Sequence, residues 1–229
     1  MFSYISVVND NSEYNRNWGN YINFHSNNEY IKLSNYSSIF KAYNEGIKRS
    51  SFNYMVFVHQ DCKIVDSRFE LVIDKIFKSD NKIGAVFMVG SPIAGNDSWS
   101  FGGLDVGVGS WYDRRENNLR VLPRKGRILV GDGFCFVSRI KDLKFDGSFD
   151  TFHFYDIIYT RDLVKAGFKI VVPDIPLTFH ASGGGRGNED WKKWKGKLDK
   201  RVGKEILVLV KDKVVSCKTK EQARELFLR

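Results

Sequence analysis

His59, Gln60 and Asp61 form the polar end of an apolar run and are the first candidates for chemistry in this sequence. The run from Met55 to Val58 has the length and composition of a buried central strand. Open α/β sheets bind their ligands at the carboxyl ends of such strands. A carboxylate at this place is therefore a candidate for binding a metal ion or for lying beside a phosphate. An ordinary polar loop after a strand fits the same three residues, and the segment alone does not separate the two interpretations.

Asp132, Asp156 and His180 are candidates of the same kind later in the chain. Asp132 lies between two glycines, which allow close backbone approach or unusual dihedral angles around it. Asp156 lies at the start of an expected helix, where a carboxylate can act as a general base or can simply interact with the helix dipole. His180 ends a short extended segment, so it is either a metal ligand or a histidine that is hydrogen-bonded at a strand end.

Strand and helix patterns alternate over the first ninety or so residues, and this alternation predicts the sheet that positions these side chains. Short apolar strands are expected at residues 4–8, 30–33, 55–58 and 83–89. A helix capped by Ser37 or Ser38 is expected to run to about Arg49, and a second amphipathic helix covers 69–77. This order is typical of an α/β fold with a mostly parallel central sheet flanked by helices. Residues 13–28 are rich in Asn and aromatic residues, and no element is assigned to them.

Residues 90–127 interrupt this alternation with many glycines and several aromatic residues, among them Trp111. A segment of this length without a clear pattern predicts a functional loop that forms a wall or lid of a pocket. Strands are again expected at 128–130, 134–137, 169–172 and 205–210, and a helix from about 154 to Gly167. The stretch 181–187 is mobile by composition, and Thr219 with Gln222 predicts a capping box for a short last helix.

Bulk composition limits the class of protein. The chain has 229 residues, of which 42% are hydrophobic, and a formal net charge of +9, which favours polyanionic partners. No apolar run reaches about 18 residues, so no transmembrane helix is expected, and the amino terminus lacks the features of a signal peptide. The three cysteines are far apart, which argues against disulfides and zinc and suits a cytoplasmic location. The simplest division is one domain over residues 1–185 and a basic carboxyl-terminal extension over 186–229, packed on or beside the mouth of the site.

Four segments follow one another in a recognisable order, namely Val58-His-Gln-Asp61, Gly131-Asp-Gly-Phe134, Phe154-Tyr-Asp156 and Phe179-His180. Together with Ala42-Tyr-Asn44 and the first strand, they resemble the family 2 glycosyltransferases of the GT-A fold. More narrowly, they resemble the glycosyltransferase-like branch that carries His-Gln-Asp where most members have Asp-x-Asp. The resemblance covers roughly residues 2–182. It implies the GT-A fold, a nucleotide diphosphate sugar as donor and a divalent metal ion, Mn²⁺ or Mg²⁺.

The resemblance also implies a role for each candidate. Asp61 would bind the metal ion, which stabilises the leaving diphosphate, and His180 would complete the metal shell and favour manganese. Asp156 would be the catalytic general base, although Tyr155 precedes it where the family has Glu. Residues implied to contact the donor nucleotide are Asn9, Asp10, Asn35, Asn44, His59 and Gln60. Asp132 is implied to contact the acceptor, and Gly133 and Trp111 are predicted to contact it as well.

The implied function is a metal-dependent, inverting glycosyltransferase, with a UDP-sugar as the first donor to expect. A catalytically silent module that holds a nucleotide or a glycan in the same cleft is the other function that fits. The acceptor would be a surface glycan, a lipid-linked glycan or the hydroxylated bases of phage-type DNA, and the basic charge suits a polyanion or an anionic surface. Lys192, Lys193 and Lys195 are the predicted polyanion contacts, and a solvated helix face is the alternative interpretation.

Overall fold

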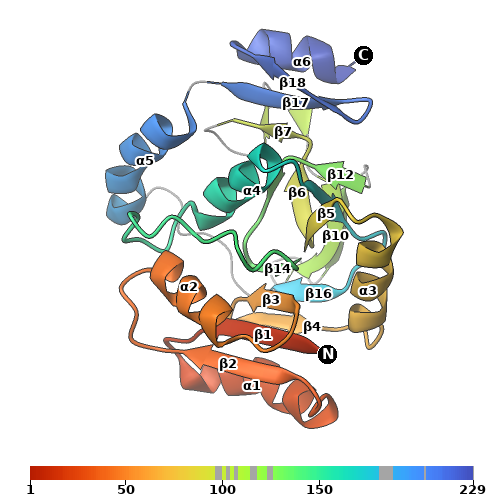
Figure 1. Cartoon of the computed structure of the whole chain (residues 1–229), viewed down its shortest axis with the longest axis vertical. Coiled ribbons are helices and arrows are strands. Elements are labelled where there is room, and N and C mark those ends of the chain that lie inside the picture. The colour runs from red at the N-terminus through yellow and green to blue at the C-terminus, as the bar shows by residue number, and fades with distance from the viewer. Residues whose placement is uncertain are drawn as a thin grey trace.

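A seven-stranded sheet forms the centre of the computed structural model, in the order β12-β15-β5-β14-β3-β1-β2 (Figure 1). Its strands are β1 (Phe2–Val7), β2 (Glu29–Leu33), β3 (Tyr54–Val58), β5 (Ile83–Phe87), β12 (Gly126–Ile128), β14 (Cys135–Ser138) and β15 (Lys169–Val172). β1 is parallel to β2 and β3, and β5 is parallel to β15. Only β14 and β12 run against their neighbours, so the sheet is mostly parallel, as the sequence predicts.

The structure describes residues 1–95, 100–101, 104–105, 108–113, 118–122, 126–180, 188–203 and 205–228. For Phe24 and for the strands between residues 100 and 122 it describes the backbone alone. The stretch 181–187, which the sequence predicts to be mobile, lies outside the described residues.

Helices cover both faces of the central sheet and bury alternate side chains of each strand. α1 (Asn11–Phe24) and α3 (Phe69–Ser79) share a core with Tyr4 and Val56. α2 (Ile39–Arg49) and α4 (Tyr155–Lys165) share a second core with Ile5 and Phe57, the next residues along the same strands. Because successive side chains of a strand point to opposite faces, strands that are apolar throughout need a helix layer on each side.

The core beneath α4 is built largely from aromatic rings. Phe136 stacks between Phe57 and Phe87, with ring centroids 4.7 and 4.5 Å away, and Phe145 stacks on Tyr159 of α4 at 4.4 Å. Aromatic pairs add about 0.5–1.5 kcal/mol each beyond the area that they bury. This packing fixes α4, and therefore the residues at its amino end, relative to the central strands.

The predicted helices at 38–49 and 69–77 and the predicted strands of the central sheet are confirmed, with ends that differ by a few residues. α1 occupies the stretch to which the sequence assigned no element. Its buried positions, Tyr14 and Trp18, are aromatic residues among many asparagines, so the apolar period is weak. Asp10 starts the helix because its carboxylate accepts hydrogen bonds from the backbone N–H groups of Ser12 and Glu13.

The prediction of one long loop over residues 90–127 is wrong for the part of that segment that the structure describes. Short strands there join a second sheet in the order β13-β6-β10-β16-β4, with β11 beside β10. The strands of this second sheet are β4 (Cys62–Ile64), β6 (Val89–Ser91), β10 (Val108–Asp113), β11 (Asn118–Leu122), β13 (Val130–Gly131) and β16 (Thr178–His180). β8 (Ser100–Phe101) and β9 (Leu104–Asp105) pair with each other. Strands this short, interrupted by glycines, lack the alternation by which sequence reveals a strand.

The last forty or so residues form the helices α5 and α6 and two strands of a small sheet (Figure 1). α5 (Glu189–Val202) buries Leu198 and Val202 in the core of α2 and α4. Beyond it, β17 (Ile206–Val210) pairs with β7 (Ile93–Ala94) and β18 (Lys213–Cys217). The predicted capping box starts α6 (Lys220–Leu228) through mutual hydrogen bonds between Thr219 and Gln222. The division of the chain at residue 185 stays a prediction. Among the helices that the structure describes, none is long and apolar enough to cross a membrane.

The burial of Leu198 generates a test of how firmly α5 is packed. Leu198→Ala should lower the free energy of unfolding by about 2–5 kcal/mol, because it leaves a cavity at a fully buried position. Urea unfolding followed by circular dichroism measures this change. Lys200→Ala, at an exposed position of the same helix, is the matched control and should change stability little. Equal stability of the two variants would contradict the packing of α5 on the core.

Candidate active site

The candidate site is built where β3 and β16 end beside the start of β4. The backbone N–H of His59 donates to the Phe134 carbonyl at 2.9 Å, which extends the β3–β14 pairing by one residue. The chain then turns, with the Cys62 N–H bonded to the His59 carbonyl, and enters β4. Because His180 lies opposite Cys62 in the antiparallel β4–β16 pair, its side chain comes to lie beside Asp61.

His59, Asp61 and His180 bring one potential metal-ligating atom each to within 4.8 Å of one another. His180 Nε2 lies 3.5 Å and His59 Nδ1 lies 3.9 Å from Asp61 Oδ1. The His180 ring is held by stacking on Phe134, with centroids 4.7 Å apart. Asp61 is 7% exposed, so the group has a carboxylate largely removed from water at its centre.

The chemistry of these residues fits a divalent cation. His180 Nε2 is buried and makes no hydrogen bond to any part of the chain that the structure describes, although it points towards Asp61. A buried imidazole nitrogen without a hydrogen bond is costly, and a bound cation would use its lone pair. Two imidazoles and one carboxylate suit Mn²⁺ and later transition metals better than Mg²⁺ or Ca²⁺, which prefer oxygen ligands. These three residues could therefore hold a metal ion, and Mn²⁺ fits better than Mg²⁺.

His59 is uncharged at neutral pH, as a metal ligand must be. Burial lowers the pKa of His59 to about 4, with a further contribution from the charge of His180. Its second nitrogen, Nε2, lies 2.6 Å from the hydroxyl of Tyr155. Burial raises the pKa of Tyr155 well above its ordinary value, so this hydroxyl keeps its proton.

Asp156 lies in the first turn of α4, beside the loop between β13 and β14. Its two oxygens accept hydrogen bonds from the backbone N–H groups of Gly133 (3.1 Å) and Ile157 (2.8 Å). Burial raises the pKa of Asp156 to about 7, and the nearby charge of Asp132 adds to the shift. A carboxyl group whose pKa is close to neutral is matched to accept a proton at physiological pH. The preceding residue, Phe154, holds a left-handed backbone conformation with φ 69°.

The sequence match agrees with this geometry. Residues 3–195, most of the chain, match the glycosyltransferase like family. The chain belongs to this family. No curated protein matches the sequence significantly.

Three solved structures, each 11% identical to this glycosyltransferase-like chain, share its fold. GalNAc-T7 with UDP, GalNAc and Mn²⁺ gives a TM-score of 0.57 over 87% of this chain and 47% of its own. A mannosyltransferase from Pyrobaculum calidifontis, in complex with GDP-Man and Mn²⁺, gives a TM-score of 0.52 over 83% of this chain and 59% of its own. S. aureus TarS (residues 1–349) in complex with UDP gives a TM-score of 0.52 over 86% of this chain and 64% of its own. The fold is therefore the GT-A fold, and the chain spans about half to two thirds of the length of these proteins.

Gln60 and Asn44 are two of the predicted nucleotide contacts. In the structure, both side chains form hydrogen bonds within the protein. The Gln60 side chain accepts from the backbone N–H groups of Asn9 and Asp10, and donates to the side chains of Asn9 and Glu13. The Asn44 side chain is bonded to both backbone groups of Phe145. These amides join loops to one another.

The other predicted nucleotide contacts lie at strand ends on the same side of the site. Asn9 follows β1 and is held by Gln60. Asp10 caps α1 with one carboxylate oxygen. Asn35 follows β2 in a left-handed conformation, φ 66°. His59, by contrast, lies in the candidate metal group, which the sequence assigned only to Asp61 and His180.

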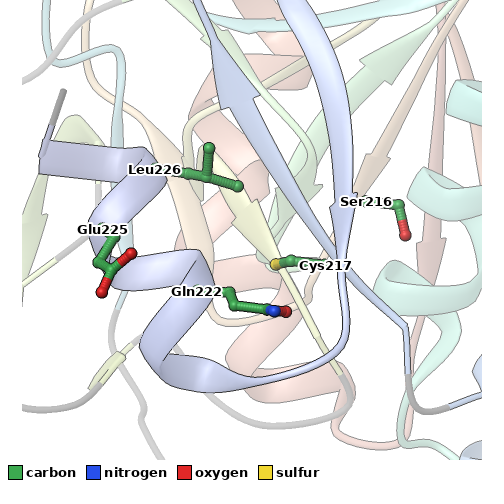
Figure 2. A pocket seen from close by; sticks show the side chains of 5 residues that line it. All are labelled: Ser216, Cys217, Gln222, Glu225 and Leu226. Atoms are coloured by element: carbon green, nitrogen blue, oxygen red, sulfur yellow. The ribbon is translucent and has the colours of Figure 1, made fainter.

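On the predicted acceptor side, the structure places Asp132 and Gly133 beside Asp156. Asp132 accepts a hydrogen bond from the Phe134 N–H at 3.3 Å, and Gly133 donates to Asp156. Trp111 lies in β10, the strand next to β16, but its side chain lies outside the described residues. A separate hollow of about 290 Å³ between β18 and α6 is lined by Ser216, Cys217, Gln222, Glu225 and Leu226 (Figure 2). It belongs to the small carboxyl-terminal sheet and contains none of the candidate residues.

The predicted polyanion contacts lie on α5. Lys192 and Lys193 are exposed, and Lys192 forms a surface ion pair with Glu189. Lys195 is half-buried and pairs with Asp199. Trp191 packs on Phe154 at 5.5 Å, so this indole contributes to the core.

Sequence reasoning did not assign a role to Tyr155 or Phe134, both of which touch the candidate metal ligands. In the sequence, Tyr155 stands out only as a departure from the family pattern. Its position next to Asp156 could have indicated a role, because neighbouring residues at the start of a helix lie near the same loop. Phe134 looked like an ordinary strand residue, and only its pairing beside His59 brings its ring over His180.

The raised pKa of Asp156 predicts how stability depends on pH. The folded state holds this proton up to about pH 7, whereas the unfolded chain releases it near pH 4, so this residue's stabilising contribution is lost as pH rises between them. In the presence of EDTA, Asp156→Asn should therefore gain on the order of 2–4 kcal/mol relative to wild type between pH 4 and pH 8. Urea unfolding at a series of pH values measures the difference.

Asp150→Asn is the control for this titration. Asp150 bonds to Lys41 and Ser37, which hold the pKa of Asp150 below its ordinary value, so its contribution changes only at lower pH. The stability difference of Asp150→Asn should be flat from pH 4 to pH 8. A flat difference for Asp156→Asn as well would show that Asp156 titrates normally.

Proposed function

We propose that this chain is a metal-dependent, inverting glycosyltransferase that moves a sugar from a nucleoside diphosphate sugar to a hydroxyl acceptor. The observation that carries the proposal is the convergence of a potential metal group, His59, Asp61 and His180, with a carboxylate of raised pKa, Asp156. Membership of the glycosyltransferase like family gives the reaction class.

His59, Asp61 and His180 would hold the cation and orient the donor diphosphate towards the strand ends. The ion, when bound, supplies Lewis-acid stabilisation of the charge that develops on the leaving diphosphate. Asn9, Asp10 and Asn35 would face the nucleoside from the ends of β1 and β2. The proposal of UDP or GDP rests on the neighbours, which were crystallised with UDP or GDP-Man. Gln60 and Asn44 would act indirectly, through the loops that they join.

Asp156 would take the proton of the acceptor hydroxyl. The acceptor oxygen forms its bond to the anomeric carbon on the face opposite the diphosphate, and the bond from that carbon to the phosphate oxygen breaks. The electron pair stays on the nucleoside diphosphate, and the configuration at the anomeric carbon inverts. The N–H groups of Gly133 and Ile157 orient the carboxylate and, with Asp132, border the place where the acceptor would bind.

The acceptor is proposed as a surface glycan, a lipid-linked glycan or hydroxylated bases in DNA. Lys192 and Lys193 project from α5, whose Trp191 packs on the residue two positions before Asp156. This proximity supports a contact between these lysines and an anionic acceptor. Lys195 would add less, because Asp199 already pairs with it.

A donor and acceptor screen read by mass spectrometry tests the proposal. Wild-type protein is incubated with Mn²⁺, each common nucleotide sugar, and glycan, lipid-linked or hydroxymethylated DNA acceptors. Transfer or donor hydrolysis supports the proposal. Nucleotide binding without turnover of any donor would instead favour a catalytically silent binding module.

Asp61 should be essential for metal-dependent turnover. Asp61→Ala removes the only carboxylate of the potential metal group, so Mn²⁺ binding and turnover should both fall to background. EDTA should abolish turnover by the wild-type protein in the same way, and added Mn²⁺ should restore that turnover. Asp66→Ala, at the half-buried carboxylate that pairs with Arg68, is the control. Turnover by Asp61→Ala within a few-fold of wild type would remove Asp61 from the metal site.

Asp156 should be essential for transfer but not for binding the donor. Asp156→Asn keeps the shape of the side chain and removes its basicity, so transfer should fall about 10²–10⁴-fold while nucleotide affinity stays within a few-fold. In the wild type, the rate of transfer should rise with pH as the Asp156 carboxyl group loses its proton and then level off, because the carboxylate form is the active one. Kinetics and calorimetry measure the two quantities. Preserved transfer with weakened nucleotide binding would assign Asp156 to the donor site.

A further inference from the structure

Tyr155 reaches His59 from α4, and its position is fixed on several sides. Its hydroxyl lies 2.6 Å from His59 Nε2, and the residue is 5% exposed. Its ring meets Tyr43 edge-on, with centroids 5.5 Å apart. A Cβ atom on residue 133 would lie 2.1 Å from the Tyr155 hydroxyl, so the ring reaches His59 only because that residue is glycine. The contact between Tyr155 and His59 is therefore built into the packing of the site.

The two nitrogens of His59 point to different partners. Nδ1 faces Asp61 Oδ1 at 3.9 Å, within the potential metal group, and Nε2 faces Tyr155. A neutral imidazole can ligate a metal ion through one nitrogen only when the other carries the proton. An acceptor for that proton fixes both the tautomer and the angle of the ring. The oxygen of Tyr155 is such an acceptor, and it adds no negative charge to a site that already holds three carboxylates.

We propose that Tyr155 is a positioning residue that accepts the Nε2–H of His59, and so fixes His59 Nδ1 as a ligand for a divalent cation. The proposal rests on the proposed function in one respect, that His59, Asp61 and His180 bind the cation. His59 and Tyr155 lie 96 residues apart in the sequence, and the structure places them in contact. Tyr155 also joins the metal group to α4, which would hold a bound cation at a fixed position relative to Asp156.

Mn²⁺ affinity tests this role without any turnover. Tyr155→Phe keeps the ring and removes only the hydroxyl, and it should weaken Mn²⁺ binding about 10–100-fold, measured from the electron paramagnetic resonance signal of free Mn²⁺. Tyr159→Phe is the matched control. It removes a buried hydroxyl from the same helix, one bonded to Ser138 and away from the metal group, and should leave Mn²⁺ affinity within about twofold.

A double-mutant cycle separates positioning from a general structural effect. In a His59→Ala background, Tyr155→Phe should change Mn²⁺ affinity less than twofold, because the group that it orients is gone. A loss of the same size in both backgrounds would overturn the proposal, as would equal Mn²⁺ affinity of Tyr155→Phe and wild type. Absence of Mn²⁺ binding by the wild type would instead remove the metal site from the proposed function.

A measurement on the wild-type protein keeps the proposal testable if Tyr155→Phe does not fold. In the protein loaded with Zn²⁺, long-range ¹H–¹⁵N NMR should show His59 protonated at Nε2, with slow exchange of that proton. The chain has four histidines, so His59→Gln identifies the signal. Protonation of His59 at Nδ1 in that spectrum would overturn the proposal.

Discussion

Three carboxylates share a part of the molecule from which the protein removes most of the water, and this constraint governs the site. Asp61 is 7% exposed, and the charge of Asp132 adds to burial in raising the pKa of Asp156 to about 7. Mutual repulsion in a medium of low dielectric is costly unless positive charge or hydrogen-bond donors offset it. The donors come from the backbone at Gly133 and Ile157. A divalent cation would offset most of the rest, and neutral imidazoles can ligate it without adding charge.

A site of this kind depends on rigid surroundings. Phe154 adopts a left-handed backbone conformation immediately before Tyr155 and Asp156, which costs on the order of 1–3 kcal/mol for a residue with a bulky side chain. Its ring is buried and packs on Trp191 of α5, while stacked phenylalanines hold α4 from below. The docking of α5 and the aromatic core therefore stabilise a backbone geometry that the sequence around Asp156 would not adopt alone. Both elements lie outside the metal group but determine where Asp156 lies.

The sequence predicts the parts of this structure that depend on local periodicity. The strands around Val58 and Val137 and the helices α2 and α3 follow from apolar spacing. That Asp61 and His180 lie together was implied only by the family resemblance. α1 and the short strands of the second sheet are not predicted, because aromatic and glycine residues weaken the apolar periodicity there. Roles that depend on tertiary partners escape as well. Gln60 and Asn44 have the side chains of nucleotide contacts, but each amide is bonded to backbone from a distant part of the chain.

The same distinction applies to charge. The sequence concentrates positive residues after position 190. In the structure, some of them form ion pairs and others are exposed to solvent. Arg201 pairs with Asp146 and Asp162 and so helps to dock α5, whereas Lys195 pairs with Asp199 of the same helix. Lys192 and Lys193 remain exposed, and a surface pair such as Lys192 with Glu189 is worth little in water. Fewer unpaired cations are therefore available to an anionic acceptor than the number of lysines and arginines after position 190 suggests. Lys192 and Lys193 lie at the end of α5 where Trp191 touches Phe154, two residues from the proposed general base.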